Sequence, residues 1–140
     1  MPFDQIIAVA ARVLEQDQHV GEQARLRPYD ITAVSQDAGI IEALADTILL
    51  YALRRNDPFF TNLLDFFVRH FPPASGRNQH GRRRSSSLSA SPPAFPEARR
   101  NFVNSLAPYC VLSYLLQLKD RHNASFLVDG RGHLIHIDYG

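Results

Sequence analysis

The stretch that decides the fold is KDRHNASFLVDGRGHLIHIDYG, residues 119–140. Within it, FLVD and HLIHID alternate side chains with the period of a β-strand. The Asp-Gly-Arg-Gly sequence between them has the composition of a tight turn. The pattern therefore predicts a β-hairpin, which a polar loop precedes and an acidic segment follows.

The two ends of this hairpin carry the side chains that phosphoryl transfer requires. One cluster is Asp120-Arg121-His122-Asn123, and the other is His136-Ile137-Asp138-Tyr139-Gly140. A phosphotransferase needs one aspartate facing the attacking hydroxyl and another that holds the magnesium bridging the phosphates. Protein kinases place this pair in an HRD loop and a DFG triplet. Here the triplets read DRH and DYG, which favours a kinase over a surface salt-bridge cluster.

Residues 101–140 resemble the catalytic core of the phosphatidylinositol 3-/4-kinase family. That family carries a helix ending in YLLQ-type residues, a DRHN loop, a GHIIHID strand and a DFG-type triplet. Lys119 makes the chain more similar to the 4-kinases, since the 3-kinases more often have glycine there. Upstream, RPYDITAVSQDAGIIEAL resembles the strand and hinge of the family, and TNLLDFFVRHF resembles its following helix.

The resemblance implies an α+β, protein-kinase-like fold over residues 1–140, truncated at both ends. Residues 4–71 would contain a helix, the hinge strand and the following helices. Residues 99–140 would contain the catalytic helix, the catalytic loop and the metal-binding motif of a mainly helical C-lobe. The family's glycine-rich loop, phosphate-binding lysine and activation loop are absent from this sequence. We therefore expect the chain alone to be inactive.

Periodicity supports this element order. Apolar residues with helical spacing predict helices over residues 4–18 and 59–71, the second beginning at Asp57-Pro58. The run YDITAV predicts a short strand. A further helix is expected from Arg99 to about Lys119, restarted at Pro108, because a proline ring suits a first helical turn.

Residues 72–98 interrupt the match. They are rich in proline, serine and arginine and poor in large apolar side chains, so we expect a disordered insert. Arg82-Arg83-Arg84 precede Ser85 and Ser86, which makes these serines candidate phosphorylation sites beside anionic lipid. A solvated linker is the simpler interpretation.

The resemblance also assigns catalytic roles. Asp120 would be the catalytic-loop aspartate, and Arg121 would hold the loop. His122 would help to remove the proton from an inositol hydroxyl, a role suited to imidazole, which titrates near neutrality. The backbone of the hinge would bind adenine near Glu42, Ala43 and Leu44. Asp4 is a candidate partner for the phosphate-binding lysine.

The metal site departs from the kinase pattern. Asp138 would bind magnesium, but the metal-binding asparagine of kinases lies five residues after the catalytic aspartate. Ser125 occupies that position and is a shorter, poorer ligand. Asn123, the family's other asparagine, is a lesser candidate. Zinc held by His122, His133, His136 and Asp138 is disfavoured, because strand alternation separates His133 from His136.

Composition limits the other possibilities. Fifteen basic and fourteen acidic residues give a net charge of +1, so nucleic-acid binding is not expected. No run approaches the ~18 apolar residues of a spanning helix, so membrane contact should be peripheral. The single cysteine, Cys110, excludes an internal disulfide and is expected to pack in the core.

The function that the resemblance implies is transfer of the ATP γ-phosphate to an inositol hydroxyl of phosphatidylinositol, in phosphoinositide signalling. ATP and Mg²⁺ or Mn²⁺ would be the cofactors. The site of action would be cytoplasmic, on the cytosolic face of intracellular membranes. Two alternatives stay open: a catalytically inactive pseudokinase that acts as a binding module, and a protein kinase of the related phosphatidylinositol-kinase-like family.

Overall fold

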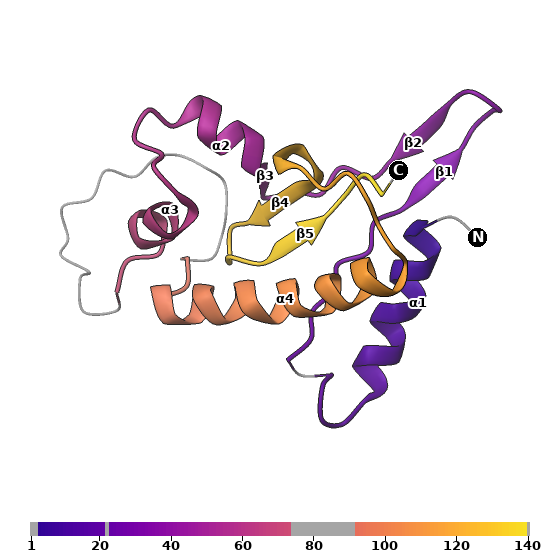
Figure 1. Ribbon diagram of the computed structural model, residues 1–140, viewed down its shortest axis with the longest axis horizontal. Coiled ribbons are helices and arrows are strands. Elements are labelled where there is room, and N and C mark those ends of the chain that lie inside the picture. The colour runs from indigo at the N-terminus through magenta and orange to yellow at the C-terminus, as the bar shows by residue number, and fades with distance from the viewer. Residues whose placement is uncertain (1–2, 22, 74–91, 140) are drawn as a thin grey trace.

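The computed structural model describes residues 3–21, 23–73 and 92–139, which form a mixed α+β fold (Figure 1). Its elements, in order, are α1 (Phe3–Gln16), β1 (Ile31–Ala33), β2 (Gly39–Ile41), β3 (Thr47–Leu49), α2 (Leu50–Asn56), α3 (Leu63–His70), α4 (Phe95–Leu115), a 3-10 turn (Asn123–Ser125), β4 (Phe126–Asp129) and β5 (Leu134–His136).

The predicted hairpin is confirmed. β4 and β5 pair antiparallel, with Phe126 opposite His136 and Val128 opposite Leu134. β3 adds a third, antiparallel strand on the other edge of β4. β1 and β2 form a separate two-stranded ribbon that projects away from this sheet (Figure 1). The turn that joins β4 to β5 lies at one end of this hairpin, and the two acidic clusters lie at the other end.

Helix α4 lies along the three-stranded sheet (Figure 1) and packs against β5, with Ser105 at Leu134 and Tyr109 at His136. The close approach needs a glycine: Gly132 has a φ of 90°, and a Cβ there would lie 2.8 Å from the carbonyl oxygen of Ala98. The buried core at this end joins α2, α3, α4 and the hairpin through Leu53, Phe66, Phe67, Phe71, Ala98, Val128 and Leu134.

A second buried cluster lies at the other end of α4. It joins α1 to the loop before β1 and to the segment after β5, through Ile7, Tyr29, Tyr109 and Tyr139. Tyr29 and Tyr139 stack with their ring centroids 6.3 Å apart. This cluster anchors the segment that contains Asp138 to α4 and α1.

The expected boundary between the insert and the catalytic helix is wrong. α4 begins at Phe95 rather than Arg99, so the last residues of the 72–98 segment are helical. Pro96 lies in the first turn, where its missing N–H costs nothing, and Ala98 is fully buried. The triple arginine, Ser85 and Ser86 lie outside the described residues.

Pro108 does not restart the helix. α4 is continuous through it and ends at Leu115. A proline in a helix interior cannot donate to the carbonyl four residues earlier, which here belongs to Asn104. The backbone N–H of Arg25 donates to that oxygen instead, at 3.0 Å. The loop after α1 thereby compensates for the missing helical hydrogen bond.

Two smaller predictions are also wrong. α3 begins at Leu63 rather than at Asp57-Pro58, because the side chain of Asn62 caps it by accepting from the N–H of Asp65 at 2.9 Å. Cys110 is exposed rather than packed in the core. Among the described residues, no helix is long and apolar enough to cross a membrane.

Candidate functional site

The DRHNAS loop is tied to the end of β5. Arg121 donates through Nη1 to the carbonyl of Ile137 at 3.1 Å and through Nη2 to the carbonyl of Asp138. A backbone bond from the N–H of Ile137 to the carbonyl of Ser125, at 3.0 Å, adds a third link. The structure therefore brings together the DRHNAS and HIDYG segments, which lie on opposite sides of the hairpin in sequence.

The two candidate aspartates share an uncommon backbone conformation. Asp120 and Asp138 each have a φ of 54°, in the left-handed region that residues other than glycine seldom occupy. Aspartate tolerates this region better than most residues. Both side chains are exposed, so both carboxylates are accessible to solvent and to ligands.

Ser125 and His122 contact each other within the loop. The Ser125 side chain is fully buried, and its Oγ lies 3.2 Å from Nδ1 of His122. The N–H of Ser125 also donates to the carbonyl of His122, at 2.8 Å, across the 3-10 turn. The Ser125 hydroxyl is thus engaged by imidazole, while the Asn123 side chain is exposed.

The donor set fits a magnesium ion only in part. Mg²⁺ in kinases is bound by one or two protein oxygens together with substrate phosphates. Asp138 supplies an exposed carboxylate that suits this role. Ser125 does not supply the second ligand, because its hydroxyl is buried against His122. Within the described residues, no three His, Cys, Asp or Glu side chains cluster closely enough to hold a metal by themselves.

The predicted hinge residues follow β2 and differ in what their backbone groups bind. Glu42 is clamped to Asp30: its N–H donates to the Asp30 carbonyl at 2.9 Å, and its carboxylate accepts from the Asp30 N–H at 3.0 Å. The Leu44 carbonyl accepts from the Thr47 hydroxyl at 2.9 Å. Ala43, between them, forms no backbone hydrogen bond to any described residue. Its N–H and carbonyl remain available to a ligand.

Asp4 lies in the first turn of α1, and the placement of its side chain is not described. No position for a lysine partner follows from it.

A buried aromatic stack supports the HIDYG segment, and sequence reasoning did not find it. The ring of His136 lies parallel to that of Tyr109, with centroids 4.4 Å apart and planes 4° apart, and meets Phe126 edge-on. Burial, together with the charge of Arg121, lowers the pKa of His136 to about 4. The imidazole is therefore neutral and serves as a flat core side chain.

The Tyr139 hydroxyl also has a structural role. It donates to the carbonyl of His136 at 2.7 Å, and burial raises the pKa of Tyr139 above its ordinary value. The guanidinium of Arg121 lies 5.9 Å from the centre of its ring. Tyr139 therefore helps to fix the turn that presents Asp138. Alternating apolar residues in HLIHI were the only sequence signal of this burial.

Comparison with known proteins gives a family for the chain. Residues 51–140 match the family described as phosphatidylinositol 3- and 4-kinase. The chain belongs to this family. Phosphatidylinositol 4-kinase of Dictyostelium discoideum is 39% identical over 115 residues, which cover 82% of this chain and 8% of that protein. Phosphatidylinositol 4-kinase beta of Mus musculus is 38% identical over 136 residues, 94% of this chain and 14% of that protein.

The same enzyme of Sorex araneus gives 38% identity over 136 residues, 94% of this chain and 15% of the relative. The chain thus spans 8% to 15% of the length of these phosphatidylinositol 4-kinases. The family match covers residues 51–140 and therefore includes both the loop that contains Arg121 and the β4–β5 hairpin. The matched region begins at Tyr51, so α1 and the β1–β2 ribbon precede it.

Proposed function

We propose that this chain is part of the catalytic region of a lipid kinase that transfers the ATP γ-phosphate to an inositol hydroxyl of phosphatidylinositol. The observation that carries the proposal is the double donation from Arg121 to the carbonyls of Ile137 and Asp138. It holds the DRH loop beside the aspartate of the DYG triplet, as in-line phosphoryl transfer requires. The names of the similar proteins favour a 4-kinase over a 3-kinase.

Each residue of the candidate site has a separate role in the proposed reaction. His122 accepts the proton of the inositol hydroxyl at its imidazole, and Asp120 orients that hydroxyl. Arg121 keeps the loop and the strand end in register. Asp138 binds Mg²⁺ or Mn²⁺, which when bound neutralises charge on the phosphates. The free backbone groups of Ala43, flanked by Glu42 and Leu44, bind the adenine of ATP.

The proposed substrate is a membrane lipid, so the protein would act at a bilayer surface. We place it in the cytoplasm, on the cytosolic face of intracellular membranes, with peripheral contact. The net charge of +1 makes nonspecific electrostatic attraction weak, so this contact would depend on particular sites.

A second candidate function is a catalytically inactive binding module. The observation that favours it is the buried Ser125 hydroxyl, which bonds His122 and leaves Asp138 without the second protein ligand of a kinase metal site. Such a module would keep the nucleotide cleft without efficient phosphoryl transfer.

Nucleotide binding separates the two functions. A fluorescent ATP analogue is titrated into the 140-residue chain with and without Mg²⁺, and Asp138→Ala is compared with Asp37→Ala. Asp37 is an exposed aspartate in the β1–β2 turn and serves as the matched control. Magnesium-dependent binding lost only in Asp138→Ala supports the kinase. Binding without a magnesium effect supports the inactive module. No binding by the folded chain leaves the family membership standing and counts against nucleotide binding by this chain alone.

A further inference from the structure

A basic hollow lies at the turn end of the β4–β5 hairpin, away from the catalytic loop. Its volume is about 700 Å³, and its walls come from the loop after α1, from α4 and from the hairpin turn. The residues that line it are Gln23, Arg25, Arg100, Asn101, Asn104, Arg131 and His133. None of the seven is acidic, although the chain as a whole is almost neutral.

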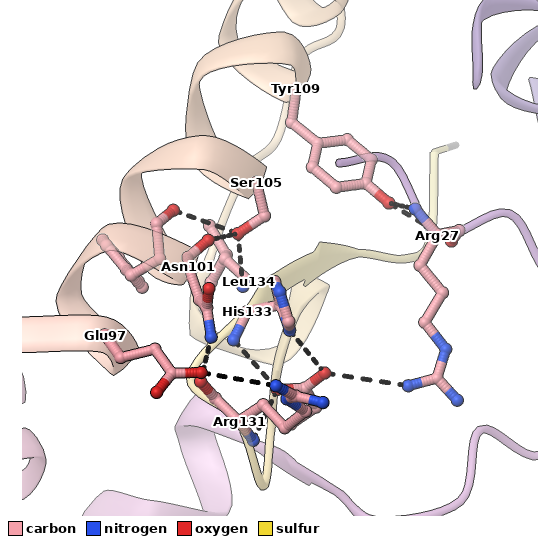
Figure 2. Close-up of polar contacts among 10 residues, drawn as sticks. Arg27, Glu97, Asn101, Ser105, Tyr109, Arg131, His133 and Leu134 are labelled. Atoms are coloured by element: carbon pink, nitrogen blue, oxygen red, sulfur yellow. Dashed lines mark hydrogen bonds and ion pairs between the residues drawn. The ribbon is translucent and has the colours of Figure 1, made fainter. Parts of the chain in front are cut away.

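The walls of the hollow are joined to one another by hydrogen bonds. The N–H of Arg25 donates to the carbonyl of Asn104 at 3.0 Å, which fixes the loop to α4. The side-chain amide of Asn101 donates to the carbonyl of Arg131 at 2.9 Å, which fixes the hairpin turn to the same helix (Figure 2). A site assembled in this way loses little freedom when a ligand binds.

Of the guanidinium groups of Arg25, Arg100 and Arg131, the first two have no partner among the described residues. Within residues 3–21, 23–73 and 92–139, the side chains of Arg25 and Arg100 form no hydrogen bond or ion pair. Arg131 points toward Glu97 (Figure 2), at 3.4 Å, but both side chains are well exposed. An exposed pair of this kind is weak, so a ligand can compete for Arg131.

The other nearby carboxylate, that of Asp129, does not line the hollow. Asp129 is 2.9 Å from Nδ1 of His133, accepts from the N–H groups of Arg131 and His133, and lies 4.0 Å from Arg27. Burial opposes its ionisation, but the hydrogen bonds from His133 outweigh burial and keep the pKa of Asp129 below its ordinary value. Its charge is therefore used in orienting His133 and the turn.

We infer that this hollow binds a small polyol phosphate, such as a phosphorylated inositol. Guanidinium groups bind phosphate oxygens in pairs, which suits Arg25, Arg100 and Arg131. The amides of Gln23, Asn101 and Asn104 can donate to and accept from ring hydroxyls, which a simple phosphate lacks. The volume lies in the range of small-ligand sites. The inference uses none of the residues assigned to phosphoryl transfer and does not depend on that activity.

The test is titration calorimetry of the full chain with inositol trisphosphate, followed by sedimentation with phosphatidylcholine vesicles that contain or lack phosphatidylinositol 4-phosphate. Binding of the soluble compound alone identifies a soluble ligand, and binding to the phosphoinositide vesicles identifies a lipid head group. Either result supports the site. The absence of binding in both arms overturns it.

Variants assign any binding to the hollow. Arg25→Ala with Arg100→Ala should weaken it about tenfold or more, because two charge-assisted contacts are lost. Arg54→Ala with Arg55→Ala, which removes two exposed arginines of α2 outside the hollow, should leave it unchanged. Equal losses in both double variants would show nonspecific attraction and overturn the proposal.

Glu97→Ala gives a change in the opposite direction. It releases Arg131 and should strengthen binding about twofold, since an exposed ion pair competes only weakly. Damage to the fold cannot produce such a gain. Unchanged or weaker binding in a folded Glu97→Ala chain would remove Arg131 from the site and contradict the proposal.

Discussion

Arg121 donates a hydrogen bond to the carbonyl oxygen of Ile137 at 3.1 Å and so joins the DRH loop to the strand end that presents Asp138. The same guanidinium donates through Nη2 to the carbonyl of Asp138 and through Nε to that of Lys119, at 3.2 Å. A planar fork of donors can serve three carbonyls at once, whereas an ammonium group cannot reach all of them.

Arg121→Lys should therefore loosen the site although the charge is kept. We expect a loss of about 1 kcal/mol in the free energy of unfolding, measured by urea denaturation, because the part-buried carbonyl of Ile137 and two exposed carbonyls lose their donor. Magnesium-dependent binding of the ATP analogue should weaken as well. Arg12→Lys, on the exposed face of α1, is the control and should change neither quantity. Wild-type stability in Arg121→Lys would show that the fork is dispensable.

A second prediction concerns the contact between α4 and β5. The buried Ser105 hydroxyl accepts from the N–H of Leu134 at 2.8 Å (Figure 2), so Ser105→Ala leaves that N–H without its acceptor. The expected cost is about 1–3 kcal/mol in unfolding free energy.

Ser113, on the same helix, provides the matched control. Its Oγ is buried, and among the described residues it has no hydrogen-bond partner. Ser113→Ala should therefore be neutral or slightly stabilising. Equal effects of the two serine substitutions in thermal and urea denaturation would contradict the role assigned to Ser105.

The hairpin turn supplies a third prediction. Gly132→Ala places a Cβ 2.8 Å from the Ala98 carbonyl at a φ of 90°, so α4 and the turn must separate. We expect a loss of at least about 1–2 kcal/mol, and the basic hollow should lose its shape. Gly130→Ala adds a methyl group in the same turn where no atom lies within 4 Å, and should be tolerated. A drop in melting temperature that is as large for Gly130→Ala would refute this reading of the contact.

These contacts show what local sequence can and cannot predict. The hairpin was predictable because alternation and an Asp-Gly turn are local signals. The start of α4 was not, because the segment around Phe95 is rich in proline and serine, and the burial of Ala98 depends on its contact with Gly132 in the distant hairpin turn. The continuity of α4 through Pro108 depends on a donor, Arg25, from a distant loop.

Some features of the candidate site could likewise be predicted from the sequence, and others could not. The DRH and DYG triplets could be recognised from the residues alone, since their types and order carry the chemistry. The partner of Ser125 could not, because a 3-10 turn brings its hydroxyl to His122. The basic hollow was also hidden, since its three arginines are far apart in sequence and converge only when the loop, helix and turn assemble.

The stability of the fold should depend on the protonation of His136. Its pKa is about 4 in the folded chain against 6.5 ordinarily, so the unfolded chain binds a proton first as the pH falls. Stability is then fully present above about pH 6.5 and lost between 6.5 and 4, by on the order of 3 kcal/mol in total. Asp129 also loses stabilisation in acid, but only below its ordinary value of 3.8, outside this window.

His136→Phe tests this dependence, because it keeps a ring against Tyr109 but cannot be protonated. The difference in unfolding free energy between the variant and the wild type should change in favour of the variant as the pH falls from 6.5 to 4. Urea denaturation at several pH values measures it. Parallel pH profiles for the two chains would mean that His136 is not the group responsible.

Ser125→Asn tests whether the missing metal ligand limits nucleotide binding. The position is fully buried, so the larger side chain should cost about 1–3 kcal/mol in stability through overpacking and loss of the bond to His122. If the chain is part of a kinase, the added amide oxygen should nevertheless strengthen Mg²⁺-dependent binding of the ATP analogue about tenfold. Ser125→Thr keeps the hydroxyl, adds similar bulk and should leave magnesium dependence unchanged. A destabilised Ser125→Asn chain with no gain in magnesium-dependent affinity would favour the inactive binding module, because restoring the ligand would then not restore the site.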